Sequence, residues 1–283
     1  MSSSVMKTLL KVVPSKTLGY RGCTVAESVV KGVVLHNELP LVTHTTGVVP
    51  AGHCPHCFYK QTSCLCQPTD YIQTLKKHSL PTLLQNNLLG HHTRLEGLTL
   101  KILLQLTLDP SSYIPSYQSL CYTKIPEEYV KDVVEGMNKV YVSVCGKHPK
   151  FVEENIMMVM GRCRLNQIGF DFAHDGDGDD NDMDVGAVYD KLSYVNHSCA
   201  PNAEVEFKGA EVVLKSLKEI EVDEEVTFDY LGGRFGTEGR KRRQLLEEMW
   251  GFKCKCEVCK RAKGRGKGGF GGRRKMLQLK KFK

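Results

Sequence analysis

Seven of the twelve cysteines fall in two short clusters, and this spacing constrains the fold more than any other feature. The clusters are Cys54-x-x-Cys57 with Cys64-x-Cys66, and Cys254-x-Cys256-x-x-Cys259. Residues 1–5 lack a charged stretch followed by an apolar core, so we expect no secretory signal and therefore reduced thiols. Close-spaced reduced cysteines are typical of metal ligands. The first cluster offers the four soft ligands that one zinc ion takes, and the second is one ligand short.

Charge is distributed unevenly along the chain. The net charge is +7, but residues 260–283 hold 11 Lys and Arg and no acid. The rest therefore carries 28 basic and 32 acidic residues, a net charge of −4. The basic tail, 261–283, is either a nuclear-localisation or nucleic-acid contact or a solubilising disordered end. No apolar run approaches the roughly 20 residues of a membrane span, so we expect no membrane association.

The hydrophobic pattern predicts strands at both ends of the folded part and helices between them. Residues 12–49 are rich in short β-prone runs, with a turn at Gly19-Tyr20-Arg21-Gly22. Residues 70–160 are mostly helical, including 126–144 and 151–160. Strands return between 185 and 230, and a basic helix is expected at 238–249. Before these strands, residues 171–184 contain seven Asp, and we expect a disordered surface loop there, since the segment has almost nothing to bury.

Three motifs follow one another in the second half. They are Asn196-His197-Ser198-Cys199, then Glu224-Glu225-Val226-Thr227-Phe228-Asp229-Tyr230, then the second cysteine cluster. In this order and spacing they resemble the C-terminal half of a SET domain with its post-SET zinc cluster, the signature of protein lysine methyltransferases. The resemblance implies a mixed α+β SET-domain fold. Its features are short β-sheets, a threaded (pseudoknot) C-terminal segment, a helical insert and small zinc modules.

The resemblance also assigns roles to single residues. Tyr230 would be the catalytic tyrosine at the methyl-transfer pore and would orient the amine. Residues implied to bind S-adenosyl-L-methionine are Gly19, Tyr20, Arg21, Gly22, Asn166, Asn196, His197, Tyr230 and Phe252. Cys199 would complete the second zinc site, giving the ligand set Cys199, Cys254, Cys256 and Cys259.

The first cluster stands where the SET–MYND subfamily carries its MYND finger. A MYND finger is longer and binds two zinc ions, whereas this segment has only about fifteen residues. We therefore interpret it as a shortened remnant that binds a single zinc ion, with Cys54, Cys57, Cys64 and Cys66 as ligands. His53 or His56 replacing one cysteine, and a loop without metal, are the alternatives.

Together these features predict six segments. They are 12–50 (N-terminal part of the SET domain), 51–69 (zinc insert), 70–160 (helical insert), 161–235 (C-terminal part, with the acidic loop), 236–260 (post-SET zinc segment) and 261–283 (basic disordered tail).

The expected function is methylation of a lysine ε-amine in a protein, histone or other, with S-adenosyl-L-methionine as methyl donor and two structural zinc ions, in the nucleus or cytoplasm. One alternative is a catalytically inactive SET scaffold, against which the intact Asn196, His197 and Tyr230 argue. The other is a zinc-containing chromatin or nucleic-acid-binding protein, whose binding would fall steeply with salt.

Overall fold

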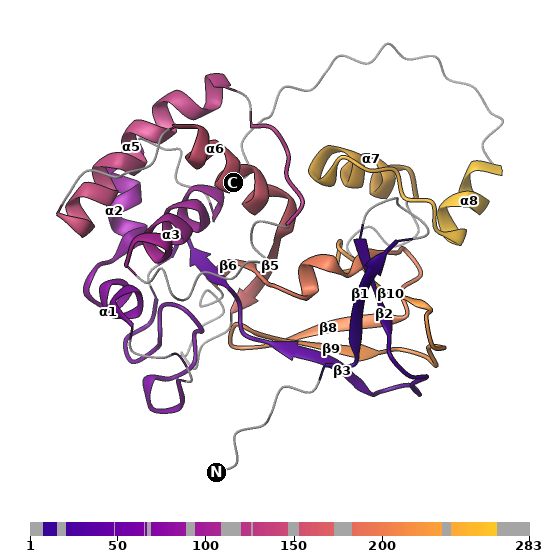
Figure 1. Cartoon of the computed structure of the whole chain (residues 1–283). Coiled ribbons are helices and arrows are strands. Elements are labelled where there is room, and N and C mark those ends of the chain that lie inside the picture. The colour runs from indigo at the N-terminus through magenta and orange to yellow at the C-terminus, as the bar shows by residue number, and fades with distance from the viewer. Residues whose placement is uncertain are drawn as a thin grey trace.

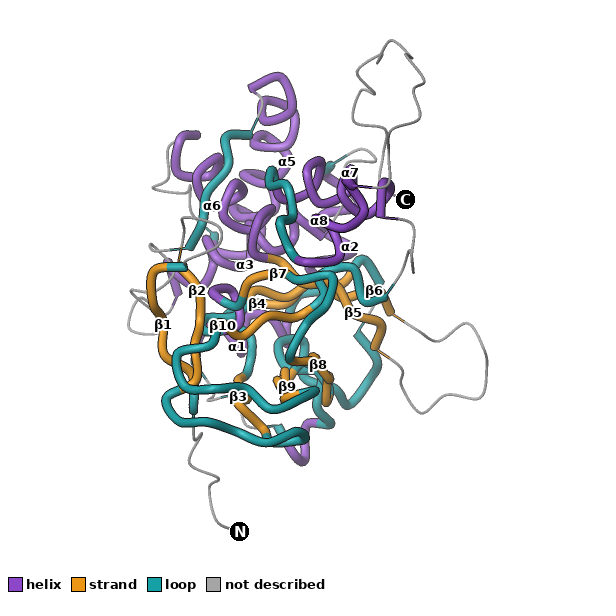
Figure 2. The backbone as a smooth tube through the Cα atoms, turned by 90° about the vertical axis from the view of Figure 1, so that its right-hand side faces the viewer, coloured by secondary structure: helices purple, strands orange, loops and turns teal. Residues whose placement is uncertain are grey.

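The computed structural model describes residues 8–15, 21–47, 49–64, 66, 69–88, 94–108, 120–125, 127–146, 153–172, 183–233 and 239–264. The helices of residues 70–166 occupy one side of the molecule with one small sheet beside them, and the other two sheets lie on the other side together with the helices of residues 239–264 (Figure 1). Turned by 90°, most of the helices lie above the strands of residues 203–216 (Figure 2). This arrangement confirms the predicted mixed fold of short sheets with a helical insert.

The first sheet joins segments from both ends of the chain. Its strand order is β1 (Leu10–Pro14), β2 (Arg21–Val25), β10 (Glu225–Phe228) and β7 (Asn196–His197). β1–β2 and β2–β10 are antiparallel, whereas β10 and β7 are parallel. The sheet therefore brings the N-terminal strands beside both predicted site motifs.

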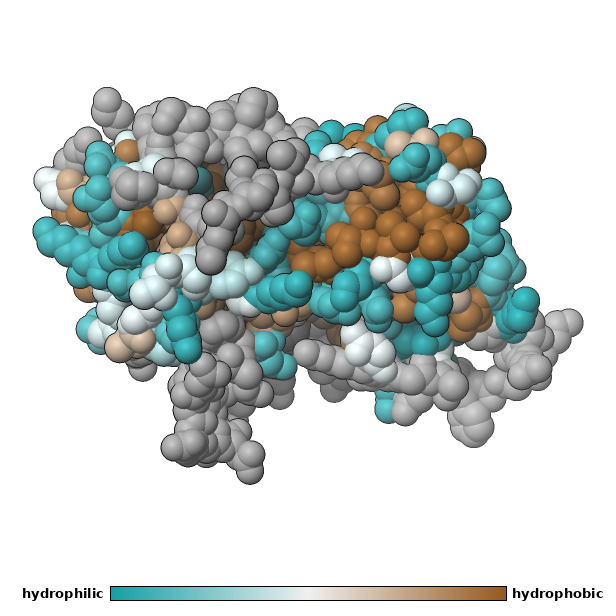
Figure 3. All heavy atoms as spheres, turned by 90° about the horizontal axis from the view of Figure 1, so that it is seen from below, coloured by the Kyte–Doolittle hydropathy of each residue, from teal (hydrophilic) through white to brown (hydrophobic). Residues whose placement is uncertain are grey.

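Two three-stranded antiparallel sheets complete the strand half. One has the order β3 (Val34–Glu38), β9 (Glu211–Ser216), β8 (Ala203–Lys208). The other has the order β4 (Val42–Thr45), β6 (Met183–Val188), β5 (Gln167–Phe172). Seen from below, apolar surface gathers on the half that bears β1, β2 and β3 (Figure 3), and Val12, Val30, Val34 and Val222 are among the exposed apolar side chains.

The helical insert holds α1 (Asp70–Lys77), α2 (Leu80–Asn87), α3 (Arg94–Leu108), α5 (Glu127–Cys145) and α6 (Glu153–Asn166). α1 begins at Thr69, whose hydroxyl accepts a hydrogen bond from the Ile72 N–H, as an N-cap does. α3 is buried along residues 96–104 and packs on β4, where a Cβ added to Gly97 would lie 2.0 Å from the His44 ring. No helix among the described residues is both long and apolar enough to cross a membrane.

Three boundaries differ from the predictions. Arg21 and Gly22 begin β2, so the predicted turn is wrong for its second half, because both residues enter the ladder with β1. The predicted acidic loop is too long, because residues 171–172 and 183–184 pair with each other in β5 and β6. The predicted disordered tail starts too early, because α8 (Glu257–Gly264) runs past 261. Gly19, Tyr20, residues 173–182 and residues 265–283 lie outside the described residues.

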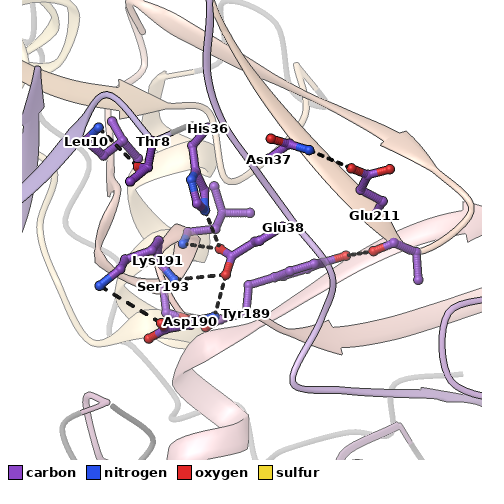
Figure 4. Close-up of polar contacts among 12 residues, drawn as sticks. Thr8, Leu10, His36, Asn37, Glu38, Tyr189, Asp190, Lys191, Ser193 and Glu211 are labelled. Atoms are coloured by element: carbon purple, nitrogen blue, oxygen red, sulfur yellow. Dashed lines mark hydrogen bonds and ion pairs between the residues drawn. The ribbon is translucent and has the colours of Figure 1, made fainter. Parts of the chain in front are cut away.

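Glu38, at the end of β3, holds the chain that leads into β7. One of its carboxylate oxygens accepts a hydrogen bond from the Leu192 N–H at 2.7 Å. The other accepts from the N–H groups of Asp190 and Lys191 at 3.1 and 3.2 Å (Figure 4). These three donors lie at the start of the short 3₁₀ turn Leu192–Tyr194, where an anion is stabilised by converging N–H groups. The buried carboxylate thus fixes the residues immediately before the Asn-His motif.

Glu38→Ala is therefore expected to lower the free energy of unfolding by about 3 kcal/mol, because it leaves buried backbone donors without an acceptor. Urea unfolding followed by circular dichroism measures this. Asn37→Ala, in the same strand as Glu38, is the control. It removes a single side-chain hydrogen bond to Glu211 of β9 and should lower the free energy of unfolding by about 1 kcal/mol or less. Equal effects of the two substitutions would contradict this role.

Candidate active site and zinc centres

The two central motifs meet in the parallel pairing of β7 with β10. Asn196 lies opposite Thr227, and His197 opposite Phe228. The Ser198 N–H donates to the Phe228 carbonyl at 3.1 Å and so extends the ladder by one residue. This pairing places the two predicted motifs, about thirty residues apart in sequence, side by side.

Asn202 holds the start of β10 in place. Its side-chain oxygen accepts a hydrogen bond from the Thr227 N–H at 2.8 Å, and its amide donates to the Glu225 carbonyl at 3.0 Å. The side chain is buried, so both contacts are shielded from water. Asn202 therefore completes backbone hydrogen bonding that the two-residue strand β7 is too short to provide.

His197 connects the strand pair to the second cysteine cluster. Its Nδ1 accepts a hydrogen bond from the Tyr230 N–H at 3.1 Å, so the ring proton must reside on Nε2 when the imidazole is neutral. Nε2 lies 3.2 Å from the Cys199 Sγ and is placed to donate to it. A buried histidine thus ties the backbone of Tyr230 to a thiolate ligand of the cluster.

Tyr230 has its hydroxyl fixed inside the protein. The hydroxyl donates to the Val195 carbonyl at 2.8 Å, and burial raises the pKa of Tyr230 well above its usual value. Its ring packs against Phe228, His197 and Trp250 with centroid distances of 4.9 to 5.3 Å. The hydroxyl therefore keeps its proton at neutral pH, and its oxygen has lone pairs left to accept a hydrogen bond.

Asn196 is oriented by Glu225. The Asn196 amide donates to Glu225 Oε1 at 2.7 Å and to the Arg21 carbonyl at 3.1 Å. The hydroxyl of Ser15 donates to the same carboxylate oxygen at 2.9 Å. A Cβ on Gly22 would lie 2.7 Å from this oxygen and 2.9 Å from the Asn196 amide nitrogen. Gly22 thus leaves the space in which the carboxylate and amide meet.

We expect Glu225→Ala to weaken binding of S-adenosyl-L-methionine at least tenfold, because Asn196 loses the acceptor that orients it. Glu225→Gln should retain most of the affinity, because its carboxamide oxygen can accept from the same two donors. Calorimetric titration of the cofactor measures both. Equal losses in the two variants would show that the charge of Glu225, and not its acceptor geometry, matters.

The remaining predicted cofactor residues are distributed around this centre. The guanidinium of Arg21 lies over the Tyr194 ring, 4.7 Å from its centroid. Phe252 is half-buried, with its ring centroid 6.0 Å from that of His197. Asn166 ends α6, and its amide donates to the carbonyls of Cys121 and Arg162. Its amide group is thus engaged with the backbone, and its cofactor contact stays a prediction.

The second cysteine cluster forms as the resemblance implied. Cys199 follows β7, and the other three cysteines come from the turn between α7 (Gly239–Trp250) and α8 and from α8 itself. The Cys199 sulfur lies 3.9 Å from that of Cys254 and 3.7 Å from that of Cys259. All four sulfur atoms, including that of Cys256, lie within 4.8 Å of one another.

The first cluster likewise brings four cysteines together. The sulfur–sulfur distances are 3.6 Å for Cys57–Cys64 and 3.9 Å for Cys54–Cys66, and all four lie within 4.8 Å of one another. His56 faces elsewhere, since its Nε2 lies 3.1 Å from the Pro40 carbonyl. The cysteines therefore form a complete ligand set without a histidine.

Both clusters fit a tetrahedral zinc ion. A Zn–S bond of about 2.3 Å places tetrahedral sulfur ligands about 3.8 Å apart, and the sulfur–sulfur distances of 3.6 to 3.9 Å given above match this separation. A disulfide would require about 2.05 Å. Hydrogen bonding with Cys57 lowers the pKa of Cys54, whereas hydrogen bonding with Cys54 raises that of Cys66, so a bound cation is needed for all the thiols to ionise. Each cluster can thus hold one structural zinc.

Three residues that position the site were not assigned a role from the sequence: Glu225, Asn202 and Trp250. Glu225 lies within the second motif and Asn202 three residues after the first, yet their partners lie in other segments of the chain. Trp250 is the only tryptophan of the sequence and lies two residues before Phe252. This proximity could have indicated from the sequence that Trp250 also packs at the site, as its contact with the Tyr230 ring shows.

Comparison with known proteins now identifies the family. The family model of the SET domain matches residues 55–231. The chain belongs to the SET domain family. Within that match lie the first cysteine cluster from Cys57 onward, β7, β10 and Tyr230, and the second cluster follows it.

Individual proteins are similar to parts of the SET-domain chain. The histone-lysine N-methyltransferase SET5 of Eremothecium gossypii is 33% identical over 108 residues, covering 38% of this chain and 18% of that protein. The N-lysine methyltransferase SMYD2 of Homo sapiens is 25% identical over 224 residues, covering 77% of this chain and 49% of that protein. The chain spans half the length or less of these curated relatives. A solved SET domain of LSMT, bound to lysine and AdoHcy, aligns over 88% of this chain and 53% of its own, with 11% identity and a TM-score of 0.46.

Proposed function

We propose that this SET-domain protein methylates the ε-amine of a lysine in a protein substrate, with S-adenosyl-L-methionine as methyl donor. The observation that carries the proposal is the junction of β7 and β10. It holds the Tyr230 hydroxyl, the Asn196 amide and the second cysteine cluster around one point of the fold. The names of the similar proteins SET5 and SMYD2 support the same activity.

The residues present suit the cofactor. Asn196 is half-exposed and held by Glu225, so its carboxamide is ready to meet the polar amino-acid part. The half-buried rings of Phe252 and Trp250 offer an apolar face for a flat base. When bound, S-adenosyl-L-methionine supplies an electrophilic methyl group on a sulfonium.

Tyr230 then acts by positioning rather than by removing a proton. Its own proton is engaged with the Val195 carbonyl, and its raised pKa keeps it protonated. The free lone pairs of its oxygen accept a hydrogen bond from the substrate amine and fix the direction of the nitrogen lone pair. Holding the amine in line lowers the barrier by removing orientational freedom before the reaction.

The substrate lysine must reach the site uncharged. A free lysine has a pKa of about 10.4, so the neutral form costs about 4 to 5 kcal/mol at pH 7. Aromatic walls such as Phe228 and Tyr230 disfavour the ammonium, because they replace water with apolar surface. The structure thus contributes to deprotonation by excluding water.

The name SMYD2 and the position of the first cysteine cluster favour a SET–MYND-like subfamily with a shortened, single-zinc insert. Location in the nucleus or cytoplasm, and contact with nucleic acid through residues 261–283, stay predictions.

Calorimetric titration with S-adenosyl-L-methionine tests the proposal at its first step. We expect one site per chain, and Asn196→Ala should weaken it at least tenfold, because the oriented carboxamide is lost. Asn37→Ala, on β3, is the control and should bind as the unaltered chain does. Absence of cofactor binding by the unaltered, zinc-loaded chain would favour the inactive scaffold instead.

A further inference from the structure

A cavity of about 230 Å³ lies between the first cysteine cluster and the helical insert. Its wall combines the segment after β4, the C-terminal end of α1, the N-terminal end of α2 and Lys101 of α3. A single water needs about 10 to 15 Å³ of cavity volume, so a small organic molecule can enter. None of the predicted cofactor residues that the structure describes lines it. In Figure 1, α1 and α2 lie on the opposite side of the molecule from α7 and α8.

Lys101 contributes a buried positive charge to this cavity. Its side chain is almost completely buried, and its Nζ donates to the Pro55 carbonyl at 3.1 Å. An ammonium has three donors, and no carboxylate among the described residues lies within ion-pair distance of Lys101. Desolvation lowers the pKa of Lys101 to about 7 against the opposing effect of the Cys54 thiolate, so the charged and neutral forms are close in free energy near neutral pH. An anion in the cavity would complete the hydrogen bonds of the ammonium and favour its charged form.

The other polar groups around the cavity favour the same kind of ligand. Lys76, His78 and His53 also line it, and none of the described residues that line it is acidic. Leu80 and Pro81, the first residues of α2, face it, and Ser79 makes no side-chain cap to that helix. The N-terminus of a helix carries partial positive charge and attracts anions. The cavity is therefore electropositive on several sides.

The rest of the wall is apolar. Val49, Pro50, Leu75, Leu80 and Pro81 surround the charged groups. A bare inorganic ion would leave these surfaces in contact with water, whereas a ligand with a carbon stem would cover them. The combination indicates an oxyanion attached to a short apolar group.

We propose that this cavity binds a small organic oxyanion, carboxylate- or phosphate-bearing, with Lys101 and the N-terminus of α2 in its wall. The competing explanation is that Lys101 serves only as a counter-charge to the zinc-thiolate cluster behind Pro55. Only the first explanation predicts that an added anion binds saturably. Only the first predicts that a surface lysine lining the cavity contributes to this binding more than its neighbour does.

The test is calorimetric titration of the full, zinc-loaded chain with glutarate and, separately, with inorganic phosphate, at constant ionic strength. We expect one saturable site. Lys101→Met should weaken binding at least tenfold. Lys76→Glu should weaken it several-fold, whereas Lys77→Glu, an equally exposed neighbour outside the cavity with the same charge change, should not. Glutarate binding more tightly than inorganic phosphate would support the contribution of the apolar wall.

Three results would overturn the proposal. They are no saturable binding of either probe, equal effects of Lys76→Glu and Lys77→Glu, and unchanged affinity in a folded Lys101→Met variant. Zinc content is measured for every variant. If Lys101→Met loses zinc or fails to fold, the comparison of Lys76→Glu with Lys77→Glu decides.

Discussion

Cys254→Ser is expected to release one of the two zinc ions and to abolish methyl transfer. Cys254 and Cys199 are ligands from segments far apart in the chain, so the metal would tie α7 and α8 to the end of β7. A structural zinc contributes about 10 to 16 kcal/mol of apparent binding free energy in small zinc modules. Without it, Phe252 and Trp250 lose the element that holds them against Tyr230.

Zinc content per chain and methyl transfer, measured on the same preparations, test this expectation. Cys145→Ser, in α5 and outside both clusters, is the control and should retain both zinc ions and activity. The contact between His197 Nε2 and the Cys199 sulfur should weaken as well, because Cys199 belongs to the cluster that loses its metal. Full activity in a Cys254→Ser variant that holds one zinc would contradict the structural role of this centre.

Tyr230→Phe is expected to lower kcat at least 100-fold while changing affinity for S-adenosyl-L-methionine less than threefold. The substitution removes the oxygen that orients the amine, and loss of one pre-organised hydrogen-bonding group in a transition state costs about 2.7 to 4 kcal/mol. The ring remains, so its packing with Phe228 and Trp250 is retained. A loss in kcat without a loss in binding is the signature of an interaction made during reaction.

Tyr59→Phe is a matched control for this substitution. It also removes a hydroxyl with a 2.7 Å hydrogen bond, here to Glu211, but beside the first cysteine cluster. Its kcat should stay within about twofold of the unaltered chain. Comparable losses in both variants would indicate general destabilisation rather than a role of Tyr230 in the reaction.

The sequence predicted the site motifs but not what orients them. The order of the Asn-His, Asp-Tyr and cysteine motifs predicted a threaded C-terminal segment through the family resemblance, and the structure shows β7 beside β10. The Ser15–Glu225 contact spans 210 residues and depends on β2 lying between β1 and β10. Nothing in the local pattern around Ser15 indicates such a partner. Contacts set by strand register across a sheet are therefore beyond a reading of local sequence.

Helix α6 shows a second limit. The predicted helix 151–160 ends just before Gly161, and glycine in a helix costs about 1 kcal/mol relative to alanine. The helix instead runs to Asn166, and a Cβ on Gly161 would lie 2.1 Å from the Thr123 carbonyl oxygen. Here glycine permits close packing of the helix against the segment that carries Cys121. A packing requirement set by tertiary structure outweighs local helix propensity.

The most direct test of the central claim is transfer of a radiolabelled methyl group from S-adenosyl-L-methionine to core histones and to a whole-cell protein extract. The unaltered chain and Tyr230→Phe are compared, and the labelled protein is hydrolysed to amino acids. The account predicts label in methylated lysine with the unaltered chain and almost none with Tyr230→Phe. Label in another amino acid, or equal label from both proteins, would contradict it.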